Sequence, residues 1–136
     1  MKQSELITAA LKGDATLVVK NARVVNVFTN EILEGDVALS EDTIIGVGKG
    51  FAAREEIDAG GAYLCPGFID AHVHIESSMV IPDSFSRVIM PHGTTTIIAD
   101  PHEIANVCGV AGVRAIYKLS DDLPLRVLFM LPSCVP

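Results

Sequence analysis

The chain has 136 residues, of which 49% are hydrophobic and 20% charged, and its formal net charge is -7 at pH 7. This composition is typical of a globular protein with a hydrophobic core and excludes intrinsic disorder. The Lys and Arg residues are scattered along an acidic chain, so nucleic acid and anionic lipid are not expected partners. No export signal and no run of about 20 apolar residues is visible, and we expect a cytoplasmic protein that does not enter a membrane.

The first half of the chain has short elements with frequent turn residues. A helix is expected over residues 4–13, and β-type runs follow at residues 16–20, 23–28, 36–40 and 43–47. The breaks between the runs carry turn-forming residues such as Asn21 and Gly35. This spacing favours a small antiparallel sheet.

The pattern changes after Gly60-Gly61, where strands begin to alternate with helices. Residues 64–73 form a nearly continuous apolar run, typical of a strand that is buried on both faces. Further strands are expected at 94–99 and 125–131, and helices at 82–90 and 102–119. The alternation predicts a parallel sheet and two domains, residues 1–64 and 65–136. Three parallel strands would leave apolar faces and edges uncovered, so we expect the chain to be an N-terminal fragment.

Two minor features have structural interpretations. Apolar residues at helical spacing between 104 and 116 predict a helix face that packs on the sheet. Three cysteines, Cys65, Cys108 and Cys134, are odd in number and far apart, which predicts reduced thiols packed in the core.

The segment that carries chemistry is Pro66 to Ser78, which contains His72 and His74. Side chains alternate along a strand, so two histidines separated by one residue point to the same side and can reach one metal ion. They also lie at the carboxyl end of a predicted parallel strand, where ligands gather in α/β folds. Asp70 lies on the same side and is either placed to support a ligand or a turn carboxylate without such a role. An exposed pair of histidines without a metal is the alternative.

A second candidate segment, residues 100–103, follows the next strand. Asp100, Pro101 and Glu103 have the form of a helix start with a capping box. That interpretation leaves His102 unexplained, so an active-site role for His102 and Glu103 stays open, as it does for Asp100. Glu76 is either part of the site or an exposed loop carboxylate. His92 precedes the second strand, at the opposite end from the chemistry, and is interpreted as structural.

Residues 66–74 resemble the first barrel strand of the amidohydrolase superfamily, and residues 57–61 resemble the approach to that barrel. Within the superfamily, residues 74–79 and 99–107 are similar to the signatures of the adenine deaminase family. The resemblance covers essentially the whole chain. It implies an α/β fold, the start of a TIM-like (β/α)8 barrel, preceded by part of a small β-sandwich.

The resemblance also implies a function in purine catabolism: hydrolytic deamination of adenine to hypoxanthine and ammonia. It implies a divalent metal held by His72 and His74, with manganese expected and iron or zinc as alternatives. His102 and Glu103 are then candidate catalytic residues, and Asp70, Glu76 and Asp100 are expected beside the ligands or the substrate. We expect the fragment alone to be inactive and the complete enzyme to be a homo-oligomer. Two alternatives stay open: an amidohydrolase acting on another cyclic amide or amidine, and a non-catalytic metal-binding module.

Overall fold

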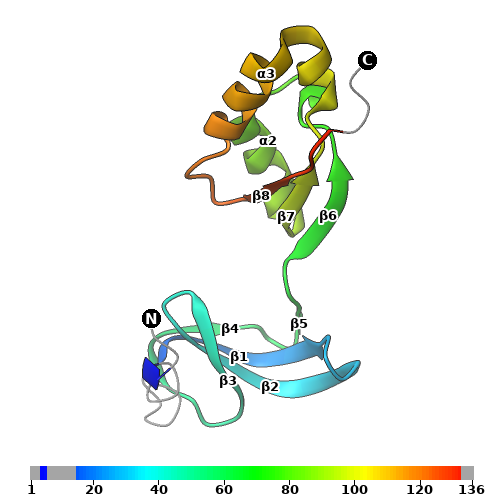
Figure 1. The fold of residues 1–136 in the computed structure, drawn as a ribbon. Coiled ribbons are helices and arrows are strands. Elements are labelled where there is room, and N and C mark those ends of the chain that lie inside the picture. Colours follow the sequence, from blue (N-terminus) through cyan, green and yellow to red (C-terminus); the bar gives the residue numbers. More distant parts are fainter. Residues whose placement is uncertain (1–3, 6–14, 133–136) are drawn as a thin grey trace. The chain divides into compact units, whose positions relative to one another are not determined.

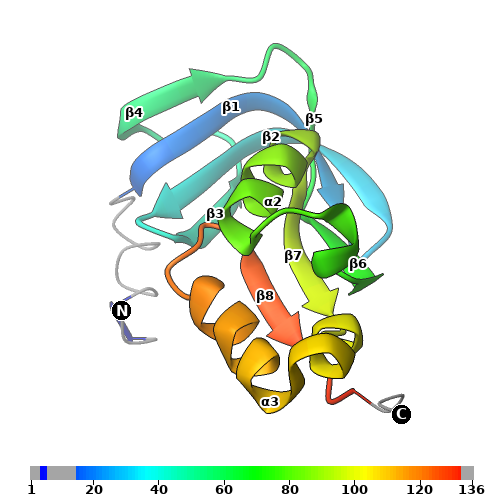
Figure 2. The ribbon, with the colours of Figure 1, turned by 90° about the horizontal axis from the view of Figure 1, so that it is seen from above.

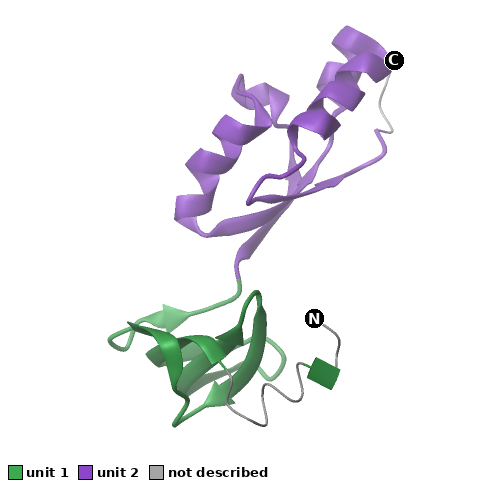
Figure 3. Cartoon of the chain, turned by 90° about the vertical axis from the view of Figure 1, so that its left-hand side faces the viewer, with its two compact units in different colours: residues 1–66 green, residues 67–136 purple. Residues whose placement is uncertain are grey.

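A computed structural model describes residues 4–5 and 15–132. The helix predicted over residues 4–13 lies almost entirely outside the described residues. The chain divides into two compact units, Met1–Pro66 and Gly67–Pro136 (Figure 3). The domain boundary expected after residue 64 stays a prediction, and each unit is described by itself.

The first unit is a five-stranded mixed sheet (Figure 1). Its strands are β1 (Ala15–Asn26), β2 (Glu31–Ser40), β3 (Thr43–Gly48), β4 (Ala53–Asp58) and β5 (Tyr63–Leu64). β1 pairs with β2, and β2 with β3, in antiparallel fashion, whereas β4 and β5 both pair with β1 in parallel. The antiparallel pairing predicted for residues 16–47 is confirmed by β1, β2 and β3, while β4 and β5 add parallel pairs that the prediction does not include.

Strand β1 joins the two runs that the sequence separates at Asn21. The register against β2 shifts between Val19 and Ala22, and Asn21 has φ 55°, so the turn-forming residue makes a bulge within one strand. The backbone N–H of Asn21 donates to Asp36 Oδ1 (3.1 Å), and its side-chain amide donates to Asp58 Oδ1 (2.9 Å). The bond from Asn21, together with one from the Gly60 N–H, lowers the pKa of Asp58 below its ordinary value of 3.8.

The second unit is a three-stranded parallel sheet with two helices. Its elements are β6 (Phe68–Val73), the 3-10 helix η1 (Glu76–Ser78), α2 (Pro82–Ile89), the 3-10 helix η2 (Met90–His92), β7 (Thr94–Ala99), α3 (His102–Leu119) and β8 (Arg126–Phe129). The order is β6-β7-β8, and Figure 2 shows the three strands running in one direction, which confirms the parallel prediction. A core of Ile75, Ile97, Ala99 and Leu125 is buried beneath side chains that include Phe85 of α2.

Two predictions for the second unit are wrong in detail. The run over residues 64–73 is not one strand: β6 begins at Phe68, and the side chains of Phe68 and Ile69 are 58% and 65% exposed rather than buried. Helix α3 is kinked at Gly109 (φ 60°, ψ -152°), a conformation that is essentially restricted to glycine. Val107 and Val110 beside the kink are 81% and 69% exposed, so the predicted apolar face does not pack there.

The cysteine prediction is also corrected. Cys65 and Cys108 are free thiols, as expected, but both are exposed, and Cys134 lies outside the described residues. Among the residues that the structure describes, no helix combines the length and the apolar character that crossing a bilayer requires.

Candidate metal centre

Three polar side chains meet at the carboxyl ends of β6 and β7. His72 lies in β6, His74 follows the end of that strand by one residue, and Asp100 directly follows β7. Because the two strands are parallel neighbours, their carboxyl ends reach the same edge of the sheet. The Asp100 N–H donates to the Val73 carbonyl (2.9 Å), which joins the segments that carry these residues.

The two imidazoles lie together as the H-x-H spacing predicts. His72 Nε2 is 3.2 Å from His74 Nε2, and the ring centroids are 4.9 Å apart. His74 Nδ1 is 2.8 Å from the carbonyl oxygen of Asp100. A carbonyl only accepts, so Nδ1 carries the proton and, in the neutral ring, the Nε2 lone pair faces His72 Nε2. The neutral form of His74 is thus held in the tautomer that a metal ligand needs.

The geometry and the donor set both fit a divalent metal. His72, His74 and Asp100 each offer one ligand atom, and these atoms lie within 4.8 Å of one another. Two ligands about 2.1 Å from one ion, at angles of about 90–109°, are separated by about 3.0–3.4 Å, which agrees with the spacing of the two Nε2 atoms. Among the described residues, Asp100 Oδ1 is the one buried side-chain oxygen or nitrogen without a hydrogen-bond partner. A cation would satisfy this oxygen.

His102 and Glu103 form a second group with His74, and their ligand atoms also lie within 4.8 Å of one another. The rings of His74 and His102 are 4.6 Å apart in an edge-on arrangement. His102 Nδ1 lies 3.2 Å from Asp100 Oδ2, so the Asp100 carboxylate connects the two groups. The sequence-predicted candidates His72, His74, Asp100, His102 and Glu103 therefore lie in one cluster.

The capping box predicted at the start of α3 does not form. The residue at the N-cap is Pro101 rather than Asp100, and no side chain of the helix start bonds to its free N–H groups. The carboxylates of Asp100 and Glu103 instead contact His102 and Ser77. The N–H of Ile104 donates to Glu76 Oε1 (3.1 Å), so the helix start is capped from a distant segment.

The other two predicted residues contact the backbone. Asp70 Oδ1 accepts a hydrogen bond from the His72 N–H (3.1 Å), so Asp70 supports the strand end rather than the His72 ring. Glu76 is held by Ile104, as described. Sequence reasoning missed Ser77, whose hydroxyl donates to Glu103 Oε2 (2.6 Å). A serine residue by itself does not indicate in a sequence that its hydroxyl binds a distant carboxylate.

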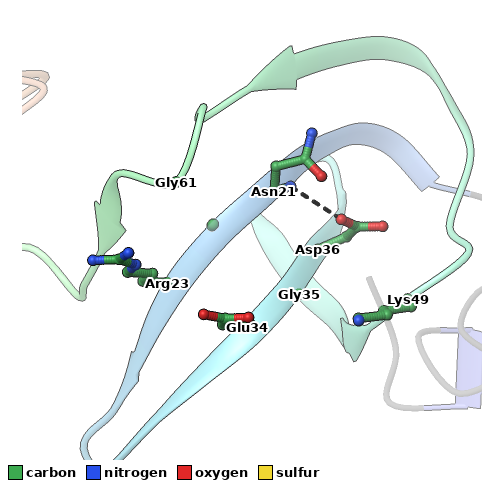
Figure 4. Close-up of a pocket in the computed structure, with 8 residues that line it drawn as sticks. Asn21, Arg23, Glu34, Gly35, Asp36, Lys49 and Gly61 are labelled. Atoms are coloured by element: carbon green, nitrogen blue, oxygen red, sulfur yellow. Dashed lines mark hydrogen bonds between the residues drawn. The ribbon is translucent and has the colours of Figure 1, made fainter.

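A separate hollow in the first unit contains none of the predicted site residues. Figure 4 shows the cations Arg23 and Lys49 and the anions Glu34 and Asp36 around it. Its opposite charges offset one another, so its lining does not select an anion or a cation.

Comparison with known proteins identifies the family. The model of the amidohydrolase family matches residues 63–136, which include His72, His74 and the whole cluster. The chain belongs to the amidohydrolase family.

Adenine deaminases are among the similar amidohydrolases. The chain is 54% identical to the adenine deaminase of Geobacillus kaustophilus over 133 residues, and 56% identical to that of Clostridium acetobutylicum over 123 residues. These matches cover 98% and 90% of this chain but only 23% and 21% of the relatives. The chain thus spans less than a quarter of the length of either relative.

A solved structure supports the α/β amidohydrolase fold. The N-acyl-D-glutamate deacylase of Bordetella bronchiseptica, crystallised with zinc and a phosphonate inhibitor, matches with a TM-score of 0.54 and 25% identity. The match covers 63% of this chain and 18% of the deacylase.

Proposed function

We propose that this chain belongs to an enzyme that hydrolyses adenine to hypoxanthine and ammonia in a metal-dependent reaction. The observation that carries the proposal is the cluster of His72, His74 and Asp100 at one sheet edge, with a buried carboxylate oxygen that lacks a partner. The adenine deaminases that are about 50% identical over most of the chain support the choice of substrate. Because the reaction removes the amino group of a purine, we propose a role in purine catabolism.

We propose His72, His74 and Asp100 as ligands of a divalent metal. Imidazole and carboxylate without thiolate suit manganese, iron or zinc, and manganese is our first choice. The metal, when bound, lowers the pKa of water so that hydroxide is available near neutral pH. The crystal structure of the similar deacylase contains zinc, so zinc stays an alternative to manganese.

His102 and Glu103 are proposed as the groups that move protons. Deamination takes a proton from water and delivers one to the leaving amine, so it needs groups that accept and donate protons beside the purine ring. Glu103 is part-buried in the first turn of α3, and its ligand atom lies within 4.8 Å of those of His74 and His102. Asp70 and Glu76 support this site through the backbone of His72 and of Ile104.

The surrounding architecture follows from the same proposal. The strands β6, β7 and β8 with α2 and α3 are proposed as the first part of a TIM-like (β/α)8 barrel, and the sheet of the first unit as part of a β-sandwich. We propose a small-molecule purine as the partner and the cytoplasm as the location, with a homo-oligomer as the complete enzyme.

The test uses the complete protein encoded by the gene, expressed with manganese. Ammonia release from adenine is measured for the wild type, for His72→Ala/His74→Ala and for His92→Ala. His92 is the matched control because it lies in η2, before β7, at the other end of the strands. We expect metal-dependent activity that the double variant loses and His92→Ala keeps. A folded, metal-loaded wild type that leaves adenine unchanged would refute the assignment.

A second candidate function is hydrolysis of another amide or amidine. The similar deacylase acts on an N-acyl substrate with the same family fold, so the strand that carries His72 and His74 does not by itself select a purine. Profiling of the complete protein with cyclic amides and N-acyl amino acids distinguishes the two candidates. Turnover of those compounds but not of adenine favours the second.

A further inference from the structure

Two hydrogen bonds connect η1 to the first turn of α3. The Ser77 hydroxyl donates to Glu103 Oε2 (2.6 Å), and the Ile104 N–H donates to Glu76 Oε1 (3.1 Å). Each bond joins residues more than 25 positions apart in the sequence. We call this pair of bonds the η1–α3 contact. It lies beside the candidate ligands without including them.

The η1 side of the contact is anchored in the core. Ile75, which precedes η1, is fully buried among Ile97, Ala99 and Leu125. The carbonyl of Ile75 accepts bonds from the Ser78 N–H (3.1 Å) and the Ser78 hydroxyl (2.6 Å), which close the turn. Ser77 therefore projects from a segment that the hydrophobic core holds in place.

The α3 side depends on η1 for its hydrogen bonds. The helix start has no side-chain cap of its own, so the carboxylate of Glu76 supplies an acceptor and a negative charge where the helix dipole favours one. The bond from Ser77 to Glu103 has a length typical of a hydroxyl donating to an ionised carboxylate. Because Ser77 engages only Oε2, the second oxygen of Glu103 is left for another partner.

We propose that Ser77 is a positioning residue that fixes the Glu103 carboxylate within the group of His74, His102 and Glu103, while Glu76 fixes the helix end that carries it. The inference rests on the proposed function, in which Glu103 transfers a proton. A carboxylate at the start of a helix can rotate about its side-chain bonds. The Ser77 bond removes part of that freedom before the substrate binds, and a misplaced catalytic group costs rate.

The experiment compares single-hydroxyl variants of the complete, metal-loaded protein on adenine. We expect Ser77→Ala to lower kcat by about 10- to 100-fold with little change in KM, since orientation rather than binding is lost. Ser77→Thr keeps a hydroxyl and should restore most of the rate. Ser78→Ala removes a hydroxyl from the same turn that does not contact Glu103, and it should keep kcat within about threefold. Metal content is measured for every variant.

A second measurement tests the bond independently of turnover. The thermal midpoints of Ser77→Ala, Glu103→Ala and the double variant form a cycle, and we expect their losses not to add. Additive losses would overturn the contact itself. Two results would overturn the positioning role. One is a non-additive loss of the thermal midpoint with an unchanged kcat in Ser77→Ala, and the other is an equal loss of kcat in Ser77→Ala and Ser78→Ala. If the wild type leaves adenine unchanged, the proposed function fails, and so does the positioning role in that reaction. The cycle of thermal midpoints still shows whether Ser77 and Glu103 interact.

Discussion

Replacing Asp100 with Asn should separate the stability of the metal-free protein from its affinity for metal. The side chain of Asp100 is 15% exposed, and its carboxylate contacts His102 through Oδ2 while Oδ1 is buried without a partner. Asn keeps the shape and can still accept from His102, but it loses the negative charge. The substitution therefore removes the charge of the proposed ligand while preserving the packing.

The magnitudes follow from these contacts. In the metal-free protein, Asn stabilises the fold because it removes a charge that is shielded from water, and destabilises it because it buries an amide N–H. These two effects offset each other, so the free energy of unfolding should change by less than about 1 kcal/mol. Loss of a group that only supports a ligand weakens metal binding by about 10- to 100-fold. If Asp100 binds the metal directly, its replacement should weaken binding by at least about 100-fold. At metal concentrations well above Kd, that factor corresponds to a loss of about 2.7 kcal/mol of metal-dependent stabilisation.

The assay is urea unfolding of wild type and Asp100→Asn with excess manganese and with a chelator, together with a competition measurement of Kd. Asp121→Asn is the control, because it removes the same charge from an exposed turn after α3. We expect the wild type and Asp100→Asn to differ only when manganese is present. An equal loss of stability with and without manganese would show that Asp100 is structural, and an unchanged Kd would show that it is not a ligand.

Three further outcomes are expected. Ile97→Ala, which truncates a fully buried core side chain of β7, should destabilise the protein by about 2–5 kcal/mol in urea unfolding, and a loss below about 1 kcal/mol would contradict the core assignment. Gly109→Ala adds a Cβ that meets nothing within 4 Å, so its expected cost of about 1–3 kcal/mol comes from the backbone conformation alone; equal or greater stability would mean that α3 straightens. Asn21→Gly accepts the positive φ but removes the bond to Asp58, so the pKa of Asp58, measured by NMR, should rise toward its ordinary value. A lowered pKa stabilises the fold above the unfolded pKa, and this contribution is lost as pH falls through the folded pKa. The variant should therefore be less stable than the wild type near neutral pH and lose this difference below about pH 4.

The sequence predicts the second unit well because its signals are local. The helix over residues 102–119 and the strand over residues 94–99 have the observed bounds, and both have strong periodic or apolar patterns. The H-x-H spacing places the two imidazoles together for the same reason, since alternation along a strand needs no distant information.

The errors arise where distant residues decide the outcome. Strand β4 is rich in charge and has no strand pattern of its own, and it forms because it pairs with β1. Asn21 does adopt the left-handed conformation that its residue type favours, but pairing with β2 makes it a bulge instead of a turn. The capping box fails because partners from other segments hold its groups: the Asp100 N–H donates to the Val73 carbonyl, and the Glu103 carboxylate accepts from Ser77. Local sequence reasoning contains none of these partners.

The orientation of His74 is held by a main-chain atom. Its Nδ1 bonds to the carbonyl oxygen of Asp100, and every amino acid at position 100 provides that oxygen. Mutation can therefore change the side chain at the proposed metal centre without releasing the imidazole of His74. The proposed third donor at position 100 can therefore be exchanged in directed libraries to test its effect on metal preference, while the ring of His74 keeps its tautomer.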